Sequence, residues 1–109
     1  MLLQTEGKIP YVEITDSPRF SYRGFMLDVS RTWVTVDELK IFIANMAHHK
    51  LNKLHLHLTD DEGWRIEIKS HPELTEKGAF RGKDYPVAAR YGKLQDNYGG
   101  YYTQEQMRD

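Results

Sequence analysis

The feature that most constrains the fold is a well-delimited amphipathic helix between two short apolar segments. Thr35 can cap this helix, and Glu38, three residues later, completes a capping box. Apolar residues then recur every three or four positions, the spacing of one helix face: Val36, Leu39, Phe42, Ile43, Met46 and Ala47. Asn52 is the predicted helix terminator. The pattern predicts one helix whose apolar stripe packs on a sheet.

The segments on either side of this helix are predicted strands. Residues 21–29 are largely aromatic and apolar, and residues 53–58 alternate leucine with lysine and histidine. Strand, helix and strand within about 35 residues form a βαβ unit, whose two strands are parallel and joined by a right-handed crossover. Ligands of parallel α/β folds bind at the carboxyl ends of the strands. We therefore expect the functional site just after residue 58.

The remaining segments are less regular. We predict a short strand at 11–14, an extended segment at 64–68, a turn at 71–74 and mostly loop over 78–100. Thr103 and Gln106 form a second capping box, so a helix is expected from about Gln104. Helices average about 11 residues, more than the chain has left there, and a lone βαβ unit leaves its sheet uncovered. We expect a fragment of a larger α/β protein.

Composition argues against several classes of function. The 109 residues include 15 basic and 16 acidic side chains, so there is no basic patch to favour nucleic acid or an anionic membrane surface. No apolar run approaches the roughly 20 residues that span a bilayer. The chain has no cysteine, which excludes disulfides and thiol chemistry within it.

Ionisable groups gather where the second predicted strand ends. His55 and His57 are two residues apart, so they face the same side of a strand. Two interpretations are open: both histidines are metal ligands, or one of them is hydrogen-bonded within the sheet. Zinc needs more than two ligands, which favours the second interpretation. Asp60 and Asp61 are ligand contacts or part of a solvated turn. Trp64 either anchors the loop or supplies a flat apolar wall. Together they predict a pocket for a polar ligand.

Arg23 stands inside an otherwise apolar and aromatic segment. A buried arginine normally needs a partner, and two interpretations are open. The guanidinium forms an ion pair with Asp28 or another carboxylate, or it directs a fork of donors at sugar hydroxyls or a ligand carboxylate. The adjacent Asp61 and Glu62 spell a pair that some glycosidases use, but adjacency is not a catalytic geometry because both carboxyls must flank one reacting atom.

Two long stretches resemble the β-N-acetylhexosaminidases of glycoside hydrolase family 20. Residues 20–31 are similar to the segment that opens the catalytic barrel, and residues 46–65 to the second barrel strand and its following loop. Shorter matches at 77–81 and 98–104 follow in the family's order. The similarity covers roughly residues 10–109.

This resemblance implies a (β/α)₈ TIM barrel, which needs about 250 residues. The chain would supply only a partial barrel, the first β-α-β and a long loop, incomplete without the remaining barrel. Residues 1–19 would be a lead-in from a preceding small α/β domain, and residues 20–109 the N-terminal part of the barrel. The resemblance also implies a periplasmic, secreted or lysosomal parent enzyme, without cofactor or metal.

The family removes terminal N-acetylglucosamine or N-acetylgalactosamine from glycans with retention, by substrate assistance. The substrate's acetamido oxygen attacks, an Asp polarises it, and the neighbouring Glu protonates the leaving oxygen. Those two residues belong to a His-x-Gly-Gly-Asp-Glu motif that this chain lacks. Asp61-Glu62 is therefore not that pair, and the isolated chain is expected to be inactive.

Carried over residue by residue, the resemblance assigns Arg23 to gripping hydroxyls of the terminal sugar. It assigns Asp60 to supporting the acid/base network, and places His57, Asp61 and Trp64 at or near the pocket wall. Two alternatives remain: a metal-dependent amidohydrolase-type barrel that uses the two strand histidines, and a non-enzymatic glycan-binding module.

Overall fold

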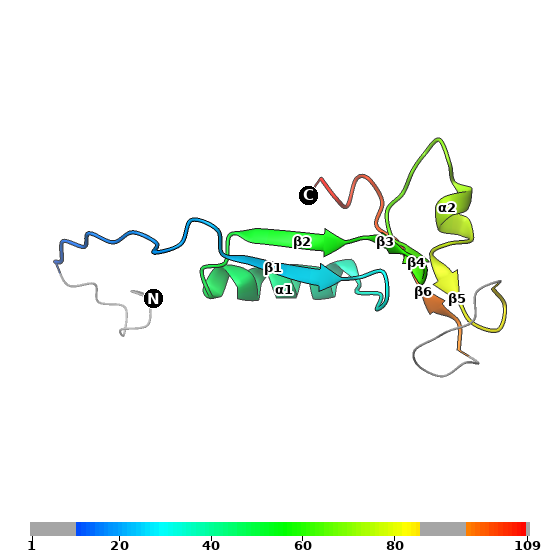
Figure 1. Cartoon of the computed structure of the whole chain (residues 1–109), viewed down its shortest axis with the longest axis horizontal. Helices are drawn as coiled ribbons and strands as arrows, with labels where there is room; N and C mark the ends of the chain where they lie inside the picture. The colour runs from blue at the N-terminus through cyan, green and yellow to red at the C-terminus, as the bar shows by residue number, and fades with distance from the viewer. Residues whose placement is uncertain (1–10, 86–95, 109) are drawn as a thin grey trace.

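The computed structural model describes residues 11–85 and 96–108. Its centre is a parallel pair of strands, β1 (Gly24–Asp28) and β2 (Lys53–His57), connected by helix α1 (Val36–His48). Figure 1 shows α1 lying along this pair. The predicted βαβ unit is confirmed, although β1 is shorter than the expected 21–29 and β2 ends one residue early.

Helix α1 begins at the predicted capping box. The Glu38 carboxylate accepts a hydrogen bond from the Thr35 backbone N–H at 2.8 Å, and this bond lowers the pKa of Glu38. In return, Thr35 Oγ1 accepts from the Glu38 N–H at 3.4 Å. The prediction that Asn52 terminates the helix is wrong, because α1 ends at His48 and the Asn52 side chain instead donates to the Ser21 carbonyl at 2.8 Å.

The core lies between the strand pair and α1. Its buried residues are Val29, Leu39 and Tyr102, with Leu27, Trp33, Val34, Val36, Leu54, Leu56 and Leu58 packed against them. Residues alternate between the two faces of a strand, so the opposite face carries Met26 and its register partner His55. Met26 is 55% exposed, which leaves that face of the sheet open to solvent.

A second group of elements lies beyond the carboxyl ends of β1 and β2 (Figure 1). It contains the antiparallel pair β3 (Thr59–Asp60) and β4 (Gly63–Trp64), and the antiparallel pair β5 (Phe80–Arg81) and β6 (Tyr98–Gly99). A bridge joins Ile66 to Tyr102. The 64–68 segment is thus paired at its start and middle, and the expected loop at 78–100 contains two short strands, with residues 86–95 outside the described part.

Three further predictions fail. The turn expected at 71–74 is the start of helix α2 (Glu73–Glu76), because Pro72 has helical backbone angles and its carbonyl accepts from the Glu76 N–H at 3.0 Å. Residues 11–14 form no strand and pair with no described strand; their side chains are exposed. The capping box of Thr103 and Gln106 forms, but the described residues after it make a turn rather than a helix.

Neither helix of the described residues is long and apolar enough to cross a membrane.

Candidate functional site

Five charged or ionisable side chains meet at the carboxyl ends of β1 and β2. We call this group the Arg31 cluster; its members are Asp28, Arg31, His57, Asp60 and Glu62. Arg31 donates from Nη1 to Asp28 Oδ2 at 2.6 Å and from Nη2 to Asp60 Oδ2 at 2.8 Å. Its Nε lies 3.3 Å from Glu62 Oε2. His57 Nε2 lies 2.7 Å from the same Asp60 oxygen. The cluster therefore joins β1, β2 and the β3–β4 hairpin.

The surroundings of Asp60 keep it ionised. The backbone N–H of Asp61 donates to Asp60 Oδ1 at 2.8 Å, and this bond, followed by those from His57 and Arg31, lowers the pKa of Asp60 to about 2. An ionised carboxylate only accepts hydrogen bonds. The Asp60 side chain is 24% exposed and that of Arg31 41%, so both reach solvent and can contact a hydroxyl-rich ligand.

The other two carboxylates complete the electrostatics of the Arg31 cluster. Burial raises the pKa of Asp28, but hydrogen bonds from the Arg31 backbone and side chain outweigh it, and the pKa lies below its ordinary value. The same hydrogen bond to Asp28 raises the pKa of Arg31. Glu62 is buried. The guanidinium is therefore held on three sides by carboxylates, which orients it and leaves its remaining N–H groups as donors.

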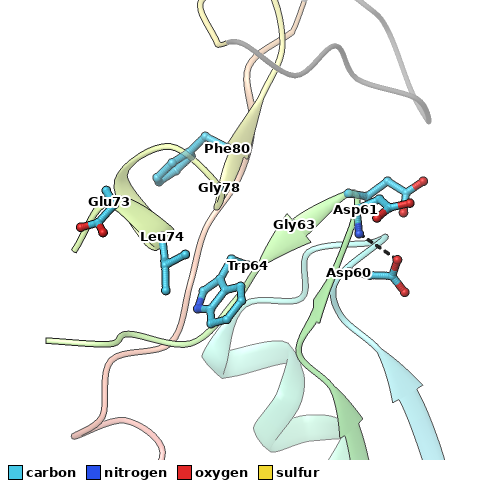
Figure 2. A pocket seen from close by; sticks show the side chains of 9 residues that line it. Asp60, Asp61, Gly63, Trp64, Glu73, Leu74, Gly78 and Phe80 are labelled. Atoms are coloured by element: carbon cyan, nitrogen blue, oxygen red, sulfur yellow. Dashed lines mark hydrogen bonds between the residues drawn. The ribbon is translucent and has the colours of Figure 1, made fainter. Parts of the chain in front are cut away.

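A pocket of about 300 Å³ lies beside Asp60, between the β3–β4 hairpin and α2. Its lining consists of Asp60, Asp61, Glu62, Gly63, Trp64, Glu73, Leu74, Gly78 and Phe80. Figure 2 shows the rings of Trp64 and Phe80 and the Leu74 side chain on one side, with Asp60 and Asp61 on the other. Trp64 Nε1 donates to the Ile66 carbonyl at 2.8 Å, so this side chain anchors the loop and also lines the pocket.

Arg23 lies at the opposite end of the sheet. It precedes β1, whereas Asp60 follows β2, so the five-residue length of the strands, about 17 Å, separates them along the sheet. Arg23 Nε donates to the Lys50 carbonyl at 2.7 Å and Nη1 to the Phe20 carbonyl at 2.5 Å. An ion pair of Arg23 with Asp28 is not formed, because Asp28 lies at the far end of β1, where it pairs with Arg31. The sugar-gripping role of Arg23 stays a prediction.

The two strand histidines share a face, as expected, but have different surroundings. His57 belongs to the Arg31 cluster, whereas His55 is exposed. Within residues 11–85 and 96–108, no three His, Cys, Asp or Glu side chains are grouped so that they could hold a metal ion. The contact between His57 and Asp60 agrees with the interpretation of a histidine that is hydrogen-bonded at the sheet.

Sequence reasoning missed two arginines. Arg31 was overlooked although it follows Asp28 by three residues at the carboxyl end of a predicted strand, a position that could have identified it. Arg65 is fully buried and bonds four backbone carbonyls. No local signal reveals Arg65, because those carbonyls lie 14 to 36 residues away along the chain.

Comparisons with known proteins show which family this chain resembles. The family profile of the glycosyl hydrolase family 20 catalytic domain matches residues 20–109. A β-hexosaminidase of Vibrio furnissii is 50% identical over 101 residues, covering 93% of this chain and 16% of that protein. An N,N'-diacetylchitobiase of Vibrio harveyi is 46% identical over 107 residues, covering 92% of this chain and 12% of that protein.

A solved structure is also similar. It is the exo β-N-acetylglucosaminidase of Vibrio harveyi in complex with N-acetylglucosamine, with a TM-score of 0.82 and 57% identity. The alignment covers 85% of this chain and 15% of that one. The chain thus spans less than a fifth of the length of these relatives, and the matched profile takes in both the βαβ unit and the Arg31 cluster. This chain belongs to glycosyl hydrolase family 20 and carries part of its catalytic domain.

Proposed function

We propose that this chain is the N-terminal part of the catalytic barrel of a β-N-acetylhexosaminidase, which removes terminal N-acetylglucosamine or N-acetylgalactosamine from glycans by substrate assistance. The Arg31 cluster is the single observation that carries the proposal. It places an ionised carboxylate and an oriented guanidinium, both solvent-accessible, at the carboxyl ends of two parallel strands, where barrel enzymes bind substrate.

The chain contributes binding and orientation rather than proton transfer. Asp60 accepts hydrogen bonds from sugar hydroxyls, and Arg31 donates to their oxygens. His57 contacts the same Asp60 oxygen that accepts from Arg31. Asp61 and Trp64 belong to the adjoining pocket and border the space that the glycan occupies. The acid and the acetamide-polarising residue come from a segment outside these 109 residues, because the His-x-Gly-Gly-Asp-Glu motif is absent.

Exposed apolar side chains on the strand pair and on α1 support the proposal that this chain is part of a larger barrel. Met26 on that face is 55% exposed, and on α1 Ile41 is 64% and Ile43 47% exposed. Burial of apolar surface contributes roughly 25 cal/mol per Å². Further strands and helices of a barrel packed against these side chains would supply that stabilisation.

The proposal is tested in a full-length family enzyme in which residues 20–109 of this chain replace the aligned segment. The Vibrio harveyi β-N-acetylglucosaminidase is a suitable recipient, given the 57% identity and TM-score of 0.82. We expect this chimaera to hydrolyse a chromogenic N-acetylglucosaminide, and the isolated 109-residue chain to release no chromophore. A chimaera that folds but does not turn over would contradict the proposal.

Two matched substitutions in the chimaera decide which arginine contacts the sugar. Arg31→Ala is expected to raise KM, whereas Arg23→Ala is expected to leave KM unchanged because its guanidinium bonds the Phe20 and Lys50 carbonyls. The reverse result would restore the role that the resemblance assigns to Arg23. N-acetylglucosamine binding that persists without any turnover would favour the glycan-binding module, and stoichiometric zinc would favour the amidohydrolase alternative.

A further inference from the structure

We infer that Arg65 is a positioning residue for Arg31: its buried guanidinium holds the two peptide carbonyls immediately before Arg31 and so sets the position from which Arg31 reaches the sugar. The inference rests on the proposed sugar-binding role of Arg31. It adds a residue that has no access to the pocket and contacts no substrate.

The contacts of Arg65 converge on one short segment. Arg65 Nε donates to the Val29 carbonyl at 3.0 Å, and Nη2 donates to the Ser30 carbonyl at 2.8 Å. The N–H groups of Val29 and Ser30 both donate to the His57 carbonyl, at 3.2 and 3.1 Å. The backbone of both residues is thus held from two sides, through the N–H groups by β2 and through the carbonyls by Arg65. Arg31 is the next residue along the chain.

The same guanidinium ties this segment to the distant loop. Arg65 Nη1 donates to the carbonyls of Ala79 and Gly100, the latter at 3.2 Å. A second buried arginine, Arg81, adds a bond from Nη2 to the Ser30 carbonyl at 3.2 Å. Residues 79–81 and 98–100 are therefore connected to the backbone just before Arg31, where the Ser30 carbonyl accepts from both arginines.

A general packing role does not account for the choice of arginine. Arg65 is 0% exposed, and none of the ion pairs among the described residues includes it. Burying a charge without an opposite charge is unfavourable, and a large apolar side chain would fill the same volume without that penalty. What only arginine supplies is a rigid planar fork with donors in several directions, and here that fork matches four carbonyls at fixed positions.

The test is a double-mutant cycle in the chimaera that combines Arg65→Lys with Arg31→Ala. Lysine keeps the charge but loses the fork. In the parent background we expect Arg65→Lys to lower kcat/KM at least about fivefold. The change should lie in KM, because Arg65 and Arg31 are coupled neighbours that share their interaction energy. In the Arg31→Ala background the same substitution is expected to change KM less than about twofold. Arg108→Lys, at an exposed arginine, is the matched control and should change neither kcat/KM nor KM.

The outcomes separate the two claims. If Arg31→Ala leaves KM unchanged, the proposed function of the Arg31 cluster fails. If Arg31→Ala raises KM but Arg65→Lys has the same effect in both backgrounds, the role of Arg65 is only structural and the inference is overturned. If Arg65→Lys does not fold, Arg81→Lys carries the test, since it removes the second donor to the Ser30 carbonyl and keeps the positive charge that interacts with Glu62. Coupling of Arg81→Lys to Arg31→Ala is then expected, and additive effects would overturn the inference.

Discussion

Replacing Gly63 with alanine is predicted to unfold the hairpin that carries the candidate site. A Cβ at Gly63 would lie 2.5 Å from Cζ and Nη2 of Arg65, about 1 Å inside an ordinary contact distance. The guanidinium has no room to retreat, because it is 0% exposed and bonded to four carbonyls. The clash therefore moves Arg65 out of hydrogen-bonding position rather than into solvent.

The magnitude follows from the bonds lost. A shift of about 1 Å takes the bonds to Val29 and Ser30 beyond hydrogen-bonding distance. The Ser30 carbonyl keeps its bond from Arg81, whereas the Val29 carbonyl is left unsatisfied, which costs about 1–3 kcal/mol. Gly63→Ala should therefore destabilise the folded state by about 1–3 kcal/mol. The two carbonyls concerned precede Arg31, so the Arg31 cluster is expected to be lost as well.

Gly24→Ala provides a matched control. A Cβ at Gly24 would lie 2.6 Å from the Tyr22 ring, nearly the same clash, but Tyr22 is 67% exposed and can rotate into solvent. Urea unfolding of the chimaera that carries residues 20–109, followed by tryptophan fluorescence, compares the two variants. Equal destabilisation by both, or a change at Gly63 of less than about 0.5 kcal/mol, would refute the reasoning.

Two pH-dependent predictions follow. Burial raises the pKa of Tyr102 from 10.0 to about 12, so between these pH values the folded chain retains a proton that the unfolded chain loses. The free energy of unfolding should therefore fall by about 2–3 kcal/mol between pH 10 and 12. Urea unfolding should show this fall in the parent but not in Tyr102→Phe. The pKa of Asp60 is lowered to about 2 from 3.8, so its contribution is complete above about pH 4 and is lost as pH falls toward 2. An NMR titration of the Asp60 carboxyl that gives an ordinary pKa would contradict the Arg31 cluster.

Much of the central fold is predictable because its signals are local. The capping box of Thr35 and Glu38 lies within one helical turn, and the apolar stripe of α1 repeats at helical spacing. Once a strand, a helix and a strand follow one another, the parallel pairing of β1 and β2 follows from the known handedness of such units. The same reasoning places Asp60 and Asp61 directly after the carboxyl end of β2, where they lie in the structure.

The short elements after the hairpin were not predictable. Strands β5 and β6 have two residues each, too few for a periodic pattern to be read. The strand expected at 11–14 has strand-like composition, yet it finds no partner among the described residues. In both cases pairing across the chain outweighs local preference.

The sequence by itself determined the βαβ unit, the edge of the sheet where the site lies and, through its two long motifs, the family. Only the tertiary structure showed which arginine meets Asp60. Arg23 and Arg31 stand at the two ends of one strand segment, and the parallel register with β2 brings Arg31 to Asp60 while it leaves Arg23 beside Lys50. That choice depends on contacts between residues 27 to 29 positions apart, which form only when the chain folds back on itself.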